Sequence, residues 1–176
     1  MKYFTPQLWT AFNGSRRESA FKLYDRRLQS YMKQLQAVIP RLNPEARAFF
    51  REACLLHDCT LARLEVGDHI DHPDQRLSQD KINRRRASVR LTVLTEDAKD
   101  VYTLRYVDVT RVEVSFPGEK VLFPVGRYSN FGDWGYDELT VTRNGRFRHE
   151  VLFASGSTIM IEFEKFAFRK TPAKSA

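Results

Sequence analysis

The spacing of the hydrophobic residues changes near His57, and this change constrains the fold more than any other feature of the sequence. From Phe21 to Val38, hydrophobic residues recur at steps of three and four, which is the pattern of one buried helix face. From Leu64 onward they alternate with polar residues, which is the pattern of a strand with one buried face. The change predicts an α+β fold, in which about three N-terminal helices pack on a mostly antiparallel, twisted sheet of about six to eight strands.

Residues 1–56 contain three signals for the start of a helix. In each signal, a small polar residue that can cap a helix precedes a proline or stands three residues before a glutamate. The signals are Thr5-Pro6, Ser15 with Glu18, and Asn43-Pro44. They predict a short first helix, a long amphipathic second helix that ends at Pro40, and a third helix.

We expect residues 1–56 and 57–168 to form one domain, followed by a disordered tail over residues 169–176. Residues 67–87 are polar and lie between two predicted strands. An insert of that length is usually functional or mobile. Near Lys165 the alternation of hydrophobic residues shifts by one position, which predicts a β-bulge.

The last hairpin contains Asn144-Gly145, a pair that usually forms a two-residue turn. That turn would place Leu139 opposite Glu150. A three-residue loop that begins one residue earlier places Leu139 opposite His149 instead. Because a slip of one residue moves every side chain to the other face of the strand, the hydrophobic pattern favours the three-residue loop and an inward-facing His149.

The composition limits the class of protein. Of the 176 residues, 42% are hydrophobic, and they include 13 Phe and 7 Tyr, so most of the chain is expected to fold around a core. No stretch approaches the roughly 18 apolar residues of a membrane span, and no apolar signal-peptide region follows the N-terminus. We therefore expect a cytoplasmic protein with no membrane span, in which Cys54 and Cys59 remain reduced.

The net charge of +7 is concentrated at the front of the chain. Residues 1–56 carry ten Lys or Arg and four Asp or Glu, and such a bias attracts nucleic acid, acidic proteins or anionic membrane surfaces. The basic residues expected on the exposed face of the second helix are Arg16, Lys22, Arg26 and Lys33, and an arginine run follows at 84–86. Because no nucleic-acid-binding motif accompanies these charges, nucleic-acid binding through the N-terminal helices is an alternative hypothesis.

Three of the four histidines lie between His57 and His72. A second alternative is a metal-dependent hydrolase that uses His57, His69 and His72, since a catalytic zinc needs three rigidly held protein ligands. However, His69 and His72 fall in the polar insert, without the helical H-E-x-x-H motif that aligns two imidazoles. We therefore expect no metal and no cofactor, and we interpret His57 and Asp58 as polar groups that stabilise the join between a helix and a strand.

Residues 124–136 combine glycines with aromatic side chains. Tyr, Trp and Arg are enriched at binding hot spots, and the candidate binding residues in this segment are Arg127, Tyr128, Phe131 and Trp134. The alternative is that these rings cap the core at the open end of the sheet. Because no catalytic constellation is recognisable, the leading hypothesis is a non-enzymatic module that binds a protein partner through this segment or an exposed sheet face.

Two stretches resemble known families. The opening KYFTPQLWTAFN and the closing pattern YDELTVTRNGRFRHEVLFASGSTIMIEF resemble a family of bacterial proteins of unknown function. The segment LHDCTLARLEV resembles the L-H-D strand entry of small immunity-like α+β proteins. The resemblance implies a bacterial, cytosolic, mostly antiparallel α+β protein of unknown role, and it supplies no catalytic residues. An immunity-like role is part of the leading hypothesis of a protein-binding module.

Overall fold

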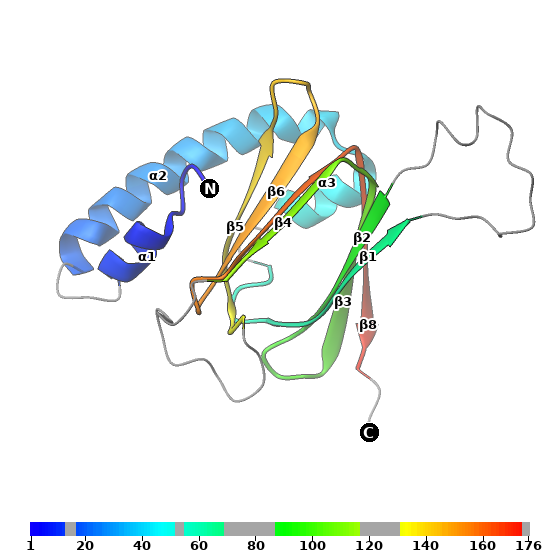
Figure 1. Cartoon of the computed structure of the whole chain (residues 1–176). Coiled ribbons are helices and arrows are strands. Elements are labelled where there is room, and N and C mark those ends of the chain that lie inside the picture. Colours follow the sequence, from blue (N-terminus) through cyan, green and yellow to red (C-terminus); the bar gives the residue numbers. More distant parts are fainter. Residues whose placement is uncertain (13–16, 52–54, 69–86, 117–130, 174–176) are drawn as a thin grey trace, which may run out of the picture.

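The helices precede the strands along the chain, as the hydrophobic spacing predicts (Figure 1). A computed structural model describes the protein over residues 1–12, 17–51, 55–68, 87–116 and 131–173. Within these ranges three α-helices are followed by antiparallel strands. The predicted α+β fold class is therefore confirmed.

Side-chain caps fix where the helices begin. Thr5 Oγ1 accepts the Leu8 N–H at 3.3 Å, and Asn43 Oδ1 accepts the Ala46 N–H at 3.2 Å, so two of the predicted caps are confirmed. Ser15, the third predicted cap, lies outside the described residues. The helices are α1 (Pro6–Phe12), α2 (Arg17–Val38), the 3-10 helix η1 (Ile39–Arg41) and α3 (Pro44–Arg51).

The described strands form two four-stranded antiparallel sheets, where the sequence predicts one. Sheet A has the order β1-β2-β3-β8, and sheet B has the order β4-β7-β6-β5. The strands of sheet A are β1 (Thr60–Asp68), β2 (Ala87–Leu94), β3 (Asp100–Val109) and β8 (Lys165–Pro172). Those of sheet B are β4 (Arg111–Ser115), β5 (Trp134–Val141), β6 (Phe147–Phe153) and β7 (Thr158–Phe163).

The two sheets are joined by strands that run from one into the other. A single residue, Thr110, separates β3 from β4, and Glu164 alone separates β7 from β8. At these positions the hydrogen bonds continue, because the Thr110 N–H donates to the Glu162 carbonyl and the Glu164 N–H donates to the Val107 carbonyl. The shift that predicted a bulge near Lys165 therefore marks the point at which the chain passes from sheet B to sheet A.

A second junction fastens the start of β1 to the start of β5. The Trp134 N–H donates to the Cys59 carbonyl at 2.7 Å, and the Asp58 N–H donates to the Trp134 carbonyl at 2.9 Å. Thr60 and Asp133 form an isolated antiparallel bridge beside them. The change from helix to strand after α3, which the sequence predicts near residue 57, is thus held in place by backbone hydrogen bonds.

Helix α2 runs beside β5, the edge strand of sheet B (Figure 1). The Leu139 N–H donates to the Tyr31 hydroxyl at 3.0 Å, and the Gln34 amide donates to the Leu139 carbonyl at 3.2 Å. Two side chains of α2 thereby satisfy backbone groups that an edge strand leaves unpaired. This pairing fixes the helix against the strand.

Aromatic rings bring α3 onto the inner face of sheet A. The Phe49 and Phe50 rings lie 5.1 and 5.2 Å from the Phe166 ring, measured between ring centroids. All three side chains are buried. Phe21, at the start of the predicted buried stripe of α2, is instead 58% exposed, although its ring packs on the ring of Phe12 on α1.

The last hairpin has the predicted register. Leu139 pairs with His149, and the side chain of His149 is fully buried. Gly145 has a φ of +80°, a conformation that glycine adopts without steric cost. The Thr142 N–H closes the loop by donating to the Arg146 carbonyl at 2.9 Å, so the three-residue loop is confirmed.

The predicted disordered tail is wrong over most of its length. Residues 169–172 belong to β8 and pair with β3, with Arg169 opposite Thr103. The Ala173 N–H extends this pairing by donating to the Lys99 carbonyl at 2.7 Å. Pairing with β3 gives this segment its strand structure, and residues 174–176 lie outside the described part of the chain.

Two further findings concern membranes and cysteines. None of the described helices is both long enough and apolar enough to cross a membrane. Cys59 is a free, buried thiol, and burial raises its pKa above the ordinary value, so the reactive thiolate is disfavoured there. Cys54 lies outside the described residues.

Glu138 ties the first residues of the chain to β5. Its carboxylate is fully buried and accepts the backbone N–H groups of Lys2, Tyr3 and Phe4 at 2.7, 2.6 and 2.5 Å. A buried carboxylate is stable only when such donors replace the lost water. The contact therefore holds residues 2–4 against sheet B.

Replacing Glu138 with alanine should lower the free energy of unfolding by roughly 3 kcal/mol, because three N–H groups lose a charged acceptor. Chemical denaturation followed by circular dichroism measures this change. Glu113→Ala is the matched control: this exposed glutamate pairs with Arg111 on the same strand, and its loss should change stability by less than about 0.5 kcal/mol. Equal effects of the two substitutions would contradict the proposed role of Glu138.

Candidate functional site

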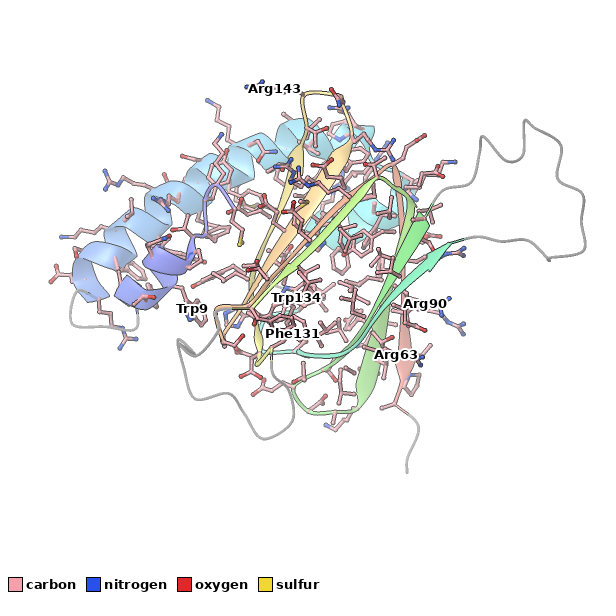
Figure 2. The ribbon with its side chains drawn as sticks, in the orientation of Figure 1. Trp9, Arg63, Arg90, Phe131, Trp134 and Arg143 are labelled. Atoms are coloured by element: carbon pink, nitrogen blue, oxygen red, sulfur yellow. The ribbon has the colours of Figure 1, made fainter. Side chains whose placement is uncertain are left out.

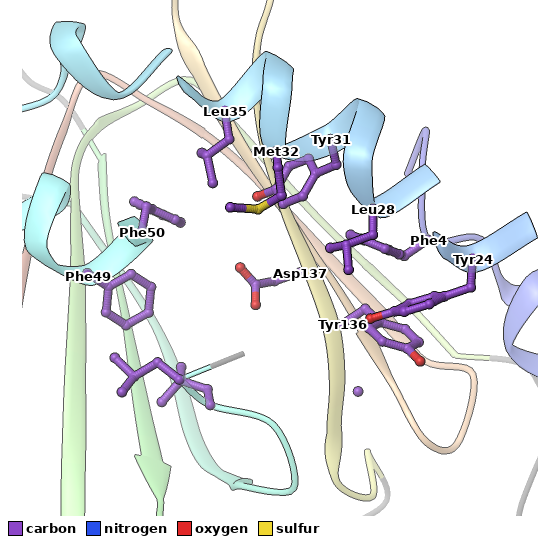
Figure 3. Close-up of a pocket in the computed structure, with 13 residues that line it drawn as sticks. Phe4, Tyr24, Leu28, Tyr31, Met32, Leu35, Phe49, Phe50, Tyr136 and Asp137 are labelled. Carbon is purple, nitrogen blue, oxygen red and sulfur yellow. The ribbon is translucent and has the colours of Figure 1, made fainter. Parts of the chain in front are cut away.

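A pocket of about 40 Å³ opens between α2, α3 and β5 (Figure 3). A space of this size holds a few water molecules or one small chemical group. Most of its lining is apolar and much of it is aromatic. The lining residues are Phe4, Tyr24, Leu28, Tyr31, Met32, Leu35, Phe49, Phe50, Leu55, Leu56, Gly135, Tyr136 and Asp137.

The local sequence explains why side chains from distant segments meet here. On α2 the lining residues recur at helical spacing, so one face of the helix looks into the pocket. On the opposite side, Gly135 allows a close approach: a Cβ atom there would lie 3.0 Å from the Leu152 carbonyl and 3.3 Å from the Trp9 ring. The tryptophan of α1 can therefore pack directly against the backbone of β5.

Asp137 is the one charged residue among the described residues that line the pocket. Figure 3 shows its carboxylate pointing into the space between α2 and α3. Asp137 Oδ2 lies 3.0 Å from His149 Nε2, and Oδ1 accepts the Trp134 indole N–H at 3.3 Å. These two contacts fix the orientation of the carboxylate and leave it able to accept further hydrogen bonds from the pocket.

Behind Asp137, a buried polar chain crosses the core. His149 Nδ1 lies 2.7 Å from the Tyr106 hydroxyl, and neither residue is exposed. Burial, followed by the negative charge of Asp137, raises the pKa of Tyr106 well above its ordinary value, so its hydroxyl keeps its proton. We expect this proton to be donated to His149 Nδ1, which places the histidine proton on Nε2, facing Asp137.

The aromatic rings beside Asp137 form a wall that suits a positive charge. The Phe4 and Tyr136 rings stack with their centroids 5.1 Å apart, and Tyr24 packs against Tyr136 at 5.5 Å. Ring faces attract cations, and the Asp137 carboxylate adds a full negative charge. The pocket is therefore complementary to a small cationic group that carries some apolar surface.

An apolar groove of about 340 Å³ adjoins the pocket. Both hollows are lined in part by Met32, Leu35 and Phe50. The groove continues between α2 and α3 along Gln36, Ile39, Pro40 and Arg51. A ligand with its charged group in the pocket can thus extend along this groove.

Of the four residues predicted to form a binding surface, the structure describes Phe131 and Trp134. Trp134 is 1% exposed, so the prediction that it binds a partner at the surface is wrong. Its indole ring packs edge-on against Phe153, and its N–H bonds Asp137. Phe131 is half-buried and packs on the rings of Phe116 and Phe153, while Arg127 and Tyr128 lie outside the described residues.

Of the three histidines in the predicted metal site, the structure describes His57. His57 Nδ1 lies 2.9 Å from Asp58 Oδ2, and the His57 ring packs edge-on to Tyr136 at 6.0 Å. His69 and His72 lie outside the described residues. Across the described ranges, no group of three or more His, Cys, Asp or Glu side chains could hold a metal ion.

Several basic side chains of the N-terminal helices form hydrogen bonds or ion pairs within the protein. Arg27 donates to the Tyr3 carbonyl at 3.0 Å, and Arg41 donates to the Gly145 carbonyl at 2.9 Å. On the exposed face of α2, Lys22 pairs with Glu18 at 3.3 Å. Part of the positive charge at the front of the chain thus serves the packing of the helices on the sheets.

Sequence reasoning missed Asp137 and Tyr106 as site residues. One signal was available: Asp137 and Glu138 interrupt an otherwise hydrophobic strand directly before the inward-facing Leu139. Paired acidic residues at such a position need buried partners. The partner of Asp137 is His149, for which the hairpin register already predicted an inward orientation.

Comparisons with protein-family models, with curated proteins and with solved structures gave no match to this chain.

Gly135→Ala should lower the free energy of unfolding by about 1–3 kcal/mol, because the added methyl group overpacks the contact between β5 and Trp9. Denaturation followed by tryptophan fluorescence measures the change. Gly67→Ala is the control, since a Cβ there meets only Ser88 Oγ at 3.7 Å and should leave stability unchanged or raise it by up to about 1 kcal/mol. Similar losses for both variants would contradict the close approach at Gly135.

The His149 ring should be neutral, with its proton on Nε2. Long-range ¹⁵N–¹H NMR spectra of the histidine-labelled protein report the tautomer directly, and a His149→Gln variant assigns the signal. The expected pattern is a protonated Nε2 that bonds Asp137 and an unprotonated Nδ1 that bonds Tyr106. A protonated Nδ1 would contradict the proposed direction of these hydrogen bonds.

Proposed function

We propose that the chain is a non-enzymatic binding protein that takes a lysine or arginine side chain of a partner protein into the pocket at Asp137. The observation that carries this proposal is the Asp137 carboxylate, held by His149 and Trp134 and directed into an aromatic pocket. A carboxylate accepts the strong, charge-assisted hydrogen bonds of an ammonium or guanidinium group. The surrounding rings add cation–π attraction.

The size and surroundings of the pocket support a protein ligand. A volume of about 40 Å³ suits a group the size of a side-chain end. The adjoining groove, with Met32 and Ile39 in its walls, offers apolar surface to the residues that flank the inserted side chain. Exposed apolar grooves between helices are typical docking sites for peptide segments.

The geometry at His149 supports a binding role rather than proton transfer. Both ring nitrogens are engaged, one by Tyr106 and the other by Asp137. The ring is also fully buried, so it cannot approach a ligand in the pocket. An immunity-like role, a bacterial origin and a cytoplasmic location are also part of this proposal.

The test measures binding of n-butylammonium and methylguanidinium by ¹H–¹⁵N NMR, with uncharged n-butanol for comparison. Both cations should shift the amide signals of Gly135, Tyr136 and Asp137. Asp137→Asn should weaken this binding at least about tenfold, because it removes a charged hydrogen-bond acceptor and keeps the shape of the side chain. A peptide-display selection against the wild type should enrich one fixed basic position, and selection against Asp137→Asn should not.

Asp133→Asn is the matched control, since it removes the same charge from an exposed position on the same segment. It should change the affinity for either cation less than about twofold. Equal binding of n-butanol and n-butylammonium would overturn the proposal, as would unchanged affinity in Asp137→Asn. Selected peptides that lack a fixed basic position would overturn the assignment of a protein ligand.

A further inference from the structure

The groove beside the pocket carries a charge opposite to that of Asp137. Arg51, the last residue of α3, is the one charged residue among the described residues that line the groove. The pocket and the groove share the apolar side chains of Met32, Leu35 and Phe50. Figure 3 shows Met32 and Leu35 on α2 and Phe50 across from them on α3. One apolar space therefore joins a carboxylate in the pocket to a guanidinium in the groove.

None of the carboxylates that the structure describes forms an ion pair with Arg51, and its side chain is exposed. A partner on the same helix would stand three or four residues away. The residues three and four positions before Arg51 are Ala48 and Arg47, so α3 itself supplies no negative charge at that spacing. The guanidinium of Arg51 is thus open to an anion in the groove.

Arg47, by contrast, is used by the fold. Its guanidinium donates to the Leu42 carbonyl at 2.8 Å and to the carbonyl of Pro40, which lines the groove, at 3.0 Å. Arg51 follows four residues later, which places a second positive charge on the same face of α3. Like charges at that spacing destabilise a helix slightly, and an anion bound at Arg51 offsets this repulsion.

We propose that the partner segment that inserts a basic side chain at Asp137 also carries an aspartate or glutamate, whose carboxylate binds Arg51. The proposal rests on the function proposed above and adds a second recognised residue to it. A guanidinium binds a carboxylate through two parallel hydrogen bonds. Opposite charges at two places along one apolar groove also fix the direction in which the segment lies.

The length of the groove limits the spacing of the two charged residues in the partner. On α2 the groove lining runs from Met32 to Ile39, which is about 10 Å along the helix axis. An extended peptide covers that distance in about three residues. We therefore expect roughly one to four residues between the basic and the acidic side chain, with apolar side chains among them.

The test is a double-mutant cycle measured by ¹H–¹⁵N NMR titration of the full chain. The ligands are acetylated, amidated peptides in which one to four alanines separate lysine from glutamate, and the same peptides with glutamine in place of glutamate. For at least one spacing, the wild type should bind the glutamate peptide about threefold more tightly than the glutamine peptide. This preference should disappear in Arg51→Gln and reverse in Arg51→Glu, where two carboxylates would meet.

The affinity for n-butylammonium, which has no carboxylate, should change less than about twofold in Arg51→Gln. This measurement also establishes that the variant keeps a folded pocket. Arg26→Gln is the matched control, since it removes the same charge from an exposed position on α2 outside both hollows. It should retain the preference for the glutamate peptide.

Equal affinities of the wild type for the glutamate and glutamine peptides at every spacing would overturn this inference. If n-butylammonium still bound in a manner that depends on Asp137, the proposed function would stand without it. A preference for glutamate that persists in Arg51→Gln, or that is lost in Arg26→Gln, would also overturn the assignment to Arg51. Absence of binding by any of the cations would overturn both proposals.

Discussion

The edge of β5 is the constraint on which the arrangement of this protein depends. β5 is the last strand of sheet B, with β6 as its neighbour in the sheet, and an unpaired strand edge is costly to bury and prone to aggregation. Three parts of the chain cover it. The residues before β1 bond the backbone of β5 at Trp134. On α2, Tyr31 and Gln34 bond the backbone of Leu139. The backbone N–H groups of residues 2–4 bond the side chain of Glu138. The helical layer and the pocket beneath it follow from this coverage.

The polar chain from Tyr106 to Asp137 connects the two sheets through the core. Tyr106 belongs to sheet A, whereas His149 and Asp137 belong to sheet B. Buried polar groups are costly unless every partner is present. Here each contact is made, and the chain ends at a carboxylate that faces the pocket. The same network therefore stabilises the packing of the sheets and orients the group that defines the candidate site.

Local signals in the sequence predicted what depends on neighbouring residues. Thr5 and Asn43 marked helix starts because a cap involves only the next turn, and the position of Leu139 relative to His149 followed from alternation alone. The division into two sheets was not predictable in this way, because single residues, Thr110 and Glu164, separate the strands of the two sheets. The shift of the alternation near Lys165 is equally typical of a β-bulge within one sheet. The buried position of Trp134 depends on Asp137 and on the junction with Cys59.

The pocket is built from segments that are far apart in the sequence. Tyr31 and Gln34 bond Leu139 at sequence separations of 108 and 105 residues, and the Phe4 ring stacks on Tyr136. Contacts of such long range form late, since the entropy of closing a large loop must first be overcome. The cavity consequently exists only in the completed fold. A ligand bound in it therefore stabilises the folded state relative to every partly folded one. Occupancy and conformational stability are therefore thermodynamically linked in this protein.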